Sequence, residues 1–231
     1  MKKKIPVYEE IIYVAGLLLL SFAVAMVAAA DFGVSMIVAP AYVLSLKVDV
    51  LSFGQSEYIV QAVLFIVFCI LMKRLRLIYF TSFGTCLIYG ALLDLWRVVI
   101  PAFNPAVTAP GSMAMPVRIA FFVGGMLLTS FSVALFYHTY FYPQVYDFFV
   151  KGLSIRYKKD TVKFKMIFDA CCLVVAVAMS LLLFRRFVGI GVGTLIMTAC
   201  NGLLIGWCGK LLEKTLDIRP RQKRLAEKFA V

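Results

Sequence analysis

Residues 11–30 read IIYVAGLLLLSFAVAMVAAA, a stretch without a single charged side chain. A helix of this length can cross the hydrocarbon core of a bilayer, which is about 30 Å thick. A helix at the surface of a soluble protein would instead carry polar residues on one face. The stretch therefore predicts a transmembrane helix, and the rest of the chain shows whether it stands alone.

The same pattern recurs along the whole chain. Six long apolar runs occupy residues 11–30, 57–72, 77–98, 117–137, 166–184 and 187–208. Only 16% of the residues are charged, whereas a soluble domain carries about a quarter. Because the runs are continuous rather than alternating, they favour helices over the strands of a membrane barrel. We predict an all-α integral membrane protein with six transmembrane helices.

Two further stretches contain apolar residues but do not fit a simple span. Residues 32–46 are too short to span, and they contain Gly33 and Pro40, which favours a re-entrant or interfacial segment. Residues 143–165 mix aromatic side chains with lysines, and we predict a loop that lies on the inner leaflet and contacts anionic lipid.

The basic residues indicate how the spans are oriented. With both termini in the cytoplasm, 19 of the 24 lysines and arginines lie on the cytoplasmic side. The exceptions are Lys47, Arg97, Arg118, Arg185 and Arg186. This bias follows the positive-inside rule and predicts a multi-pass protein with both ends in the cytoplasm. The formal net charge of +12 is therefore interpreted as an orientation signal, and we predict no nucleic-acid partner.

The chain is predicted to form one membrane domain over residues 1–231. Its first half, 8–100, and its second half, 115–209, each hold three of the six runs. The basic segment 210–231 is predicted to be a cytoplasmic tail that anchors the topology, with partner binding as the alternative.

Catalytic and metal-binding patterns are not visible in the sequence. His138 is the single histidine, and the six cysteines fall within apolar runs without metal-ligand spacing. No nucleophile and base can be paired from the sequence. We predict no metal, no cofactor and no enzymatic activity.

Polar residues inside the third run form a stripe. Ser82, Cys86, Gly90 and Asp94 recur every four residues, and Arg97 follows three residues later. Residues at this spacing share one helix face. Since charged groups are costly within a bilayer, Asp94 and Arg97 are interpreted either as part of a solute site or as a structural salt bridge.

Other apolar runs also contain isolated polar side chains. Thr198 and Asn201 share a face of the sixth run, where small residues also permit close helix contact. Asp169 lies near the cytoplasmic end of the fifth run, and we interpret it as solvated rather than as a site residue. The predicted solute-binding residues are Asp94, Arg97, Asn201, Gln61, Thr198, Ser35 and Tyr42.

The two halves share short motifs. The third run contains FGT at 83–85 and LDLW at 93–96, and the sixth contains VGT at 192–194 and IGW at 205–207. Because three spans reverse the direction of the chain, a repeat of this kind would be inverted in the membrane. We predict a 3+3 inverted repeat, an arrangement found in many transporters.

Several motifs also carry a family resemblance. They are GVS at 33–35, PAYVLS at 40–45, FGT at 83–85, VGIGVGT at 188–194 and GLLIG at 202–206. Over most of residues 10–210 the chain resembles the YczE/YitT-like family of bacterial membrane proteins. The resemblance implies a bacterial cytoplasmic membrane location and supplies no activity and no functional residue. Members often have a proline soon after the Gly-x-Ser motif, whereas Met36 follows Ser35 here.

Together these observations predict a transporter or permease for a small polar or zwitterionic solute. The alternatives are a solute-binding membrane subunit of a modular uptake system and a non-transporting regulatory or assembly protein. The predicted partners are membrane lipids and the solute, with a homodimer or a partner membrane subunit as a further possibility.

Overall fold

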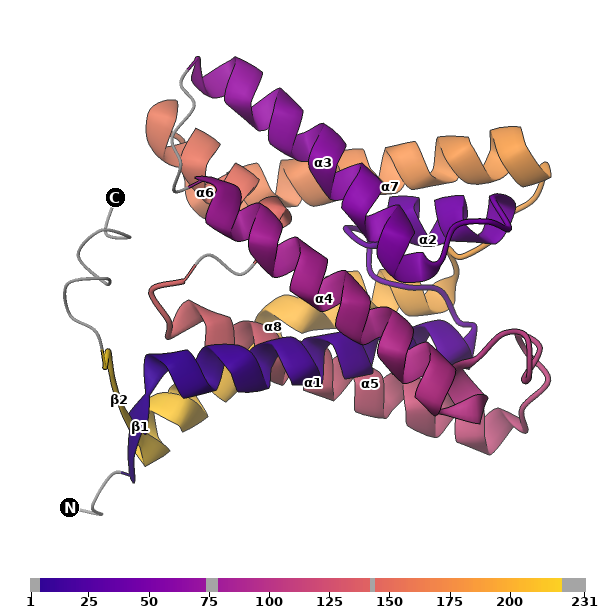
Figure 1. The fold of residues 1–231 in the computed structure, drawn as a ribbon, viewed down its shortest axis with the longest axis horizontal. Helices are drawn as coiled ribbons and strands as arrows, with labels where there is room; N and C mark the ends of the chain where they lie inside the picture. The colour runs from indigo at the N-terminus through magenta and orange to yellow at the C-terminus, as the bar shows by residue number, and fades with distance from the viewer. Residues whose placement is uncertain (1–4, 74–78, 142–143, 222–231) are drawn as a thin grey trace.

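The computed structural model describes residues 5–73, 79–141 and 144–221. Within these ranges, six helices are long and apolar enough to cross a membrane. They are α1 (Glu9–Ala30), α3 (Phe53–Met72), α4 (Tyr79–Val99), α5 (Met115–Tyr137), α7 (Thr161–Phe184) and α8 (Val192–Thr215). In Figure 1, α1 and α5 lie broadly along the long axis of the molecule, and α3 and α4 run obliquely to it. The prediction of an all-α, multi-pass membrane protein is confirmed. Residues 77–78 of the third run, residue 143 and residues 222–231 lie outside the described ranges.

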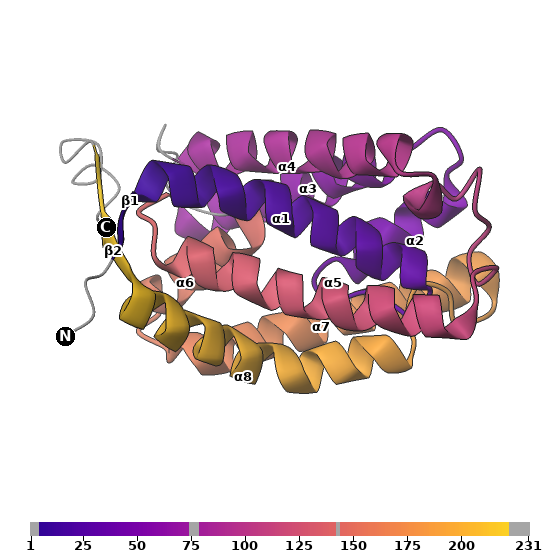
Figure 2. The same cartoon turned by 90° about the horizontal axis from the view of Figure 1, so that it is seen from below.

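The two ends of the bundle differ. A short parallel pair of strands, β1 (Ile5–Tyr8) and β2 (Leu216–Arg219), lies at the end that holds both termini (Figure 2). We call this the terminal end. The opposite, far end holds the connections at residues 48–52, 100–114 and 185–191, including the 3₁₀ turn η1 (Pro101–Phe103).

The start of the basic tail is part of the fold. The last helix continues to Thr215, and β2 then pairs with β1, so residues 210–219 are structured rather than a simple solvated anchor. Leu216 and Ile218 pack against a small core around Ile12 and Leu212. This part of the tail is ordered because its apolar residues find partners on the distant N-terminal segment, while its cytoplasmic location stays a prediction.

Segment 32–46, predicted to be a non-spanning segment, contains a short helix. Helix α2 (Ala39–Lys47) begins inside the bundle and ends near the far end (Figure 1). The preceding chain turns at Gly33, whose φ is +99°, and an added Cβ there would lie 2.5 Å from the Gly191 nitrogen. The Val34 N–H donates to the Gly189 carbonyl at 3.1 Å, which joins this segment to the start of α8.

A second short helix was missed. Helix α6 (Val145–Arg156) lies within the stretch predicted to be a leaflet-bound loop, yet it packs against α3 and α7. Val145, Phe148 and Val150 are buried. The prediction was wrong because the lysines are concentrated in the later part of 143–165, while the start of α6 is apolar enough to enter the core.

Each half therefore has the same order of elements: a long helix, a short helix and two long helices. The pairs that pack are also matched in part, since α1 contacts α4 as α5 contacts α8, while α2 and α6 each contact both α3 and α7. This order supports the predicted 3+3 arrangement, although the inverted repeat itself stays a prediction. One pair differs: α3 packs on α4, whereas α7 and α8 make no extensive contact in their described parts.

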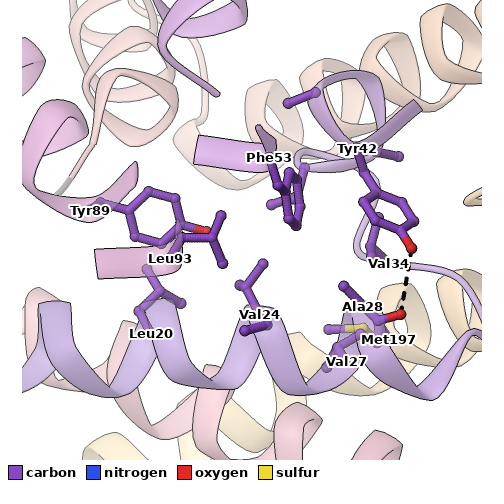
Figure 3. Close-up of a cluster of buried hydrophobic side chains, with 14 of the residues drawn as sticks. Leu20, Val24, Val27, Ala28, Val34, Tyr42, Phe53, Tyr89, Leu93 and Met197 are labelled. Carbon is purple, nitrogen blue, oxygen red and sulfur yellow. Dashed lines mark hydrogen bonds between the residues drawn. The ribbon is translucent and has the colours of Figure 1, made fainter. Parts of the chain in front are cut away.

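The main core surrounds α1. Leu20 and Val24 of α1 face Tyr89 and Leu93 of α4, as Figure 3 shows. All four side chains are buried, so α1 and α4 share a largely apolar interface. Leu20, Val24 and Tyr89 also line a cavity inside the bundle.

Candidate functional site

A cavity of about 300 Å³ lies inside the bundle, within the size range of small-molecule sites. Its walls come from α1, residues 35–38, α4, α5, the start of α6, α7 and α8. Its polar lining consists of Ser35, Tyr89, Thr129, Gln144, Tyr146, Asp147, Lys165, Asp169, Thr198 and Asn201. Both halves of the chain therefore contribute to one site.

Most of the remaining wall is apolar. Leu20 and Val24 of α1, Val133 and Phe136 of α5, and Met197 of α8 line the cavity. A ligand would thus meet polar groups on some sides and hydrocarbon on the others, a combination typical of sites that orient a small organic molecule.

The charged groups of the cavity gather in one corner. The Lys165 ammonium lies 3.5 Å from an Asp147 oxygen and 3.9 Å from an Asp169 oxygen. Lys165 and Asp169 are one turn apart near the start of α7, while Asp147 comes from α6. Two carboxylates and one ammonium give this corner an excess of negative charge, which favours a ligand with a positive group.

Three polar atoms of the cavity lack hydrogen-bond partners. Thr129 Oγ1, Gln144 Nε2 and Asp169 Oδ1 are buried and accept or donate no hydrogen bond within the described residues. The Lys165 contact to this Asp169 oxygen is at ion-pair rather than hydrogen-bond distance. An unpaired buried polar atom costs about 1–3 kcal/mol. All three atoms belong to residues that line the cavity, which makes it the candidate site for a bound molecule.

A buried hydrogen-bonded network lies behind the cavity wall. Glu57 and Gln61, one turn apart on α3, are both fully buried. Glu57 Oε2 accepts hydrogen bonds from Gln61 Nε2 at 3.0 Å and from the Tyr146 hydroxyl at 2.9 Å. Gln61 Oε1 accepts one from the Val145 N–H at 3.2 Å. Burial and the nearby Glu57 raise the pKa of Tyr146 well above its ordinary value, so its phenol stays a donor.

Some predicted site residues reach the cavity. Ser35, Thr198 and Asn201 line it. The Thr198 hydroxyl donates to the Thr194 carbonyl at 2.8 Å, and Asn201 Oδ1 accepts from the Ser130 hydroxyl at 3.3 Å. The hydrogen bond from α5 thus fixes the orientation of the Asn201 side chain, including its NH₂ group.

Gln61 and Tyr42 lie near the cavity without lining it. Gln61 belongs to the buried network described above. Tyr42 is buried, and its hydroxyl donates to the Ala28 carbonyl at 3.5 Å (Figure 3). Burial raises the pKa of Tyr42 to about 12, so this phenol remains neutral.

Asp94 and Arg97 lie at the far end, away from the cavity lining. Asp94 accepts hydrogen bonds from the Ser52 hydroxyl and from the Gly54 N–H at 2.8 Å, so its carboxylate caps the first turn of α3. Arg97 lies over the Phe53 ring, 5.4 Å from its centroid. Within the described residues, no ion pair joins Asp94 to Arg97.

Glu57, Lys165 and Asp169 were not among the predicted site residues, although Gln61 was, and the two pairs that they form share a detectable signal. Glu57 and Gln61 are four residues apart in α3, and Lys165 and Asp169 are four apart in α7. Each pair begins four residues after its helix starts, in the third element of its half. A comparison of the two halves at this position would have found them. The cavity residues of α6 could not be found, because that helix was taken for a surface loop.

The comparison with protein families places the chain. A model described as a family of unknown function, DUF6198, matches residues 7–210. The chain belongs to this family. The matched range contains every element that lines the cavity. No curated protein and no solved structure matches the chain. The chemistry of the cavity is therefore the main guide to the function.

Proposed function

We propose that the protein is a membrane transporter for a small polar or zwitterionic solute that binds in this cavity. The observation that carries the proposal is the group of unpartnered buried atoms on Thr129, Gln144 and Asp169, three residues that line one cavity beside the Lys165 ion pairs. A stable structural core would pair such groups with each other.

The chemistry of these atoms defines the solute. Asp169 Oδ1 needs a hydrogen-bond donor, and an ammonium or amine of the solute satisfies it. Gln144 Nε2 needs an acceptor, such as a carboxylate, carbonyl or hydroxyl oxygen. The apolar wall around Leu20, Val24 and Met197 would receive the hydrocarbon part of the same molecule.

Transport, rather than binding alone, is supported by the arrangement of the halves. The cavity is shared by two halves with the same order of elements, as in transporters that alternate access around a fixed site. Helices α7 and α8 are joined at residues 185–191 and diverge toward the terminal end (Figure 1). Because they make no extensive contact there, their separation could change without breaking a packed interface.

The finer location is part of the same proposal. The distribution of basic residues and the resemblance to YczE/YitT-like proteins support a bacterial cytoplasmic membrane with both termini in the cytoplasm. The terminal end would then face the cytoplasm, and solute would reach the Lys165 corner from that side.

The test begins with the purified full-length protein in lipid nanodiscs. Amino acids, small amines and small carboxylates are screened for an increase in thermal stability, since a ligand at about 100 times its Kd stabilises by about 2.7 kcal/mol. We expect compounds with an amine to act. Asp169→Asn should abolish the response, whereas the same substitution at Asp94, outside the cavity, should retain it.

A compound that passes the screen is then tested for uptake into proteoliposomes. Uptake lost in Asp169→Asn supports transport through this cavity. A stabilising ligand without uptake points to the solute-binding subunit instead. A response that survives Asp169→Asn and disappears in Asp94→Asn contradicts the site.

A further inference from the structure

Glu57 is a carboxyl group held inside a membrane-spanning helix. It lies on α3, has no exposed surface, and packs where α3 meets α4 and α6. An ionised carboxylate at such a place is costly unless a positive group compensates it. The environment of its two oxygens therefore decides what this residue can do.

The two oxygens of Glu57 differ. Oε2 accepts from both Gln61 and Tyr146, whereas Oε1 has no hydrogen-bond partner within the described residues. In the same residues no lysine or arginine forms an ion pair with Glu57. The titratable groups that face it are Cys86 and Tyr89 from α4, Tyr146 from α6 and Cys172 from α7. None of these groups supplies a positive charge.

This arrangement suits a proton better than a metal ion. Both donors occupy Oε2, which leaves Oε1 free to carry a proton. No group of three or more acidic, cysteine or histidine side chains that could hold a metal was found among the described residues. The neutral acid needs no counterion, while the two donors stabilise the ionised form. Neither state is excluded, which is the requirement for reversible protonation.

We propose that Glu57 binds and releases a proton at Oε1 and couples this step to the cavity through Tyr146. The use of the proton in transport rests on the proposed function, but proton binding itself does not. Tyr146 lines the cavity and bonds to Glu57 through the same side chain.

Helix α6 is the element that would carry the coupling. Its first turn is held on one side by the Tyr146 bond to Glu57 and on the other by Asp147, 3.5 Å from Lys165. Hydrogen bonds to an ionised acceptor are stronger than those to a neutral one. Release of the proton therefore strengthens the hydrogen bond from Tyr146 to Glu57 and draws Tyr146 toward α3. Uptake of the proton weakens this bond. Gln144, with its unpartnered amide, sits directly before this turn.

The proton balance is simple. The proton that Glu57 binds comes from water and returns to water, without electron transfer or a further reactant. Coupling requires only that the two protonation states favour different positions of α6.

Infrared spectroscopy on the full chain in nanodiscs tests the proposal without any solute. A protonated carboxylic acid has a C=O band separate from that of a carboxylate. We expect such a band near neutral pH, its loss as the pH rises, and its absence in Glu57→Gln. Glu213→Gln, which removes an exposed carboxyl at the end of α8, should leave it in place.

Tyr146→Phe provides the second measurement and keeps the ring that fills the site. Because it removes a donor to the ionised oxygen, it should move the titration midpoint of the band upward by about one pH unit. A band that persists in Glu57→Gln overturns the proton site. An unchanged midpoint in Tyr146→Phe overturns the link to the cavity. This measurement does not depend on the Glu57→Gln protein, so it remains decisive if that variant does not fold. If the band titrates as expected but no compound stabilises the protein in the screen, the proton site is supported and the proposed function is not.

Discussion

Helices α3 and α4 of the first half pack directly on each other, whereas α7 and α8 of the second half, at the same places in the order, do not. The glycines show why. An added Cβ on Gly54 of α3 would lie 2.1 Å from the Gly90 carbonyl oxygen of α4. Around Gly202 and Gly206 of α8, nothing lies within 4 Å of an added Cβ. The same residue type thus permits close helix contact in one half and meets open space in the other.

The polar groups of the two halves differ in the same way. Asp94 is fully engaged at the start of α3, by Ser52 and Gly54. Asp169 of α7 keeps one oxygen without a hydrogen bond and faces the cavity. The aspartate of the first half closes an interface, whereas the aspartate of the second half stays available to the cavity. This teaches that a shared order of elements does not imply a shared role.

The largest effect on stability is expected from a substitution that prevents the close contact between α3 and α4. Gly54→Ala should destabilise the protein by about 3 kcal/mol, because the new methyl group meets backbone that cannot move aside. Gly206→Ala, the matched change in α8, should leave stability unchanged or raise it by up to about 1 kcal/mol. Equilibrium unfolding in mixed micelles measures both. Equal losses at the two positions would remove the distinction between the halves.

The aspartates give the next comparison. Asp94→Asn should lower the free energy of unfolding by about 2 kcal/mol, because it replaces a charged acceptor of two hydrogen bonds at a helix start. Asp169→Asn should change it by less than about 1 kcal/mol, since Asp169 is partly exposed and Lys165 keeps Asp147. The same unfolding assay applies, and a larger loss at Asp169 would show that it is structural.

Two buried threonines sharpen the comparison further. Thr194 Oγ1 donates to the Val34 carbonyl at 2.7 Å, so Thr194→Val should cost about 1 kcal/mol. Thr129 Oγ1 is unpartnered, so Thr129→Val should be neutral or stabilising by up to about 1 kcal/mol in the absence of solute. Thermal unfolding in nanodiscs compares them. A stability loss in Thr129→Val would reveal a partner for that hydroxyl.

The smallest effect at neutral pH is expected at Tyr42 of α2, which lies beside Gly189 in the connection before α8. Its hydrogen bond to Ala28 is long, at 3.5 Å, so Tyr42→Phe should cost less than about 1 kcal/mol at pH 7. Burial raises its pKa from 10.0 to about 12. The unfolded phenol therefore ionises first, and the stability contributed by the buried neutral phenol is lost between those two pH values.

Unfolding of the two proteins across this alkaline range measures the difference. The wild-type protein should lose more stability than Tyr42→Phe as the pH rises from 10 to 12. Parallel curves would place Tyr42 in contact with solvent.

The sequence predicted the spans well and the site only in part. Each apolar run became a helix, because hydropathy over about 20 residues is a local property of the chain. Ser35, Thr198 and Asn201 were found because a polar residue in an apolar run is conspicuous. Asp94 was conspicuous for the same reason, yet it caps a neighbouring helix. Conspicuous polarity shows that a partner is required and leaves open which partner it is.

The sequence by itself determined that the chain lies in a lipid bilayer, that it has six spans, and that a non-spanning segment lies between the first two. What the tertiary structure alone decided is which polar groups meet. Tyr146 lies 89 residues from Glu57, and Gly54 lies 40 from Asp94. It also decided that α6 enters the core and that α7 and α8 stay apart. Burial in lipid is encoded in each segment, whereas the pairing of polar groups depends on segments far apart in the chain and forms only when the helices pack.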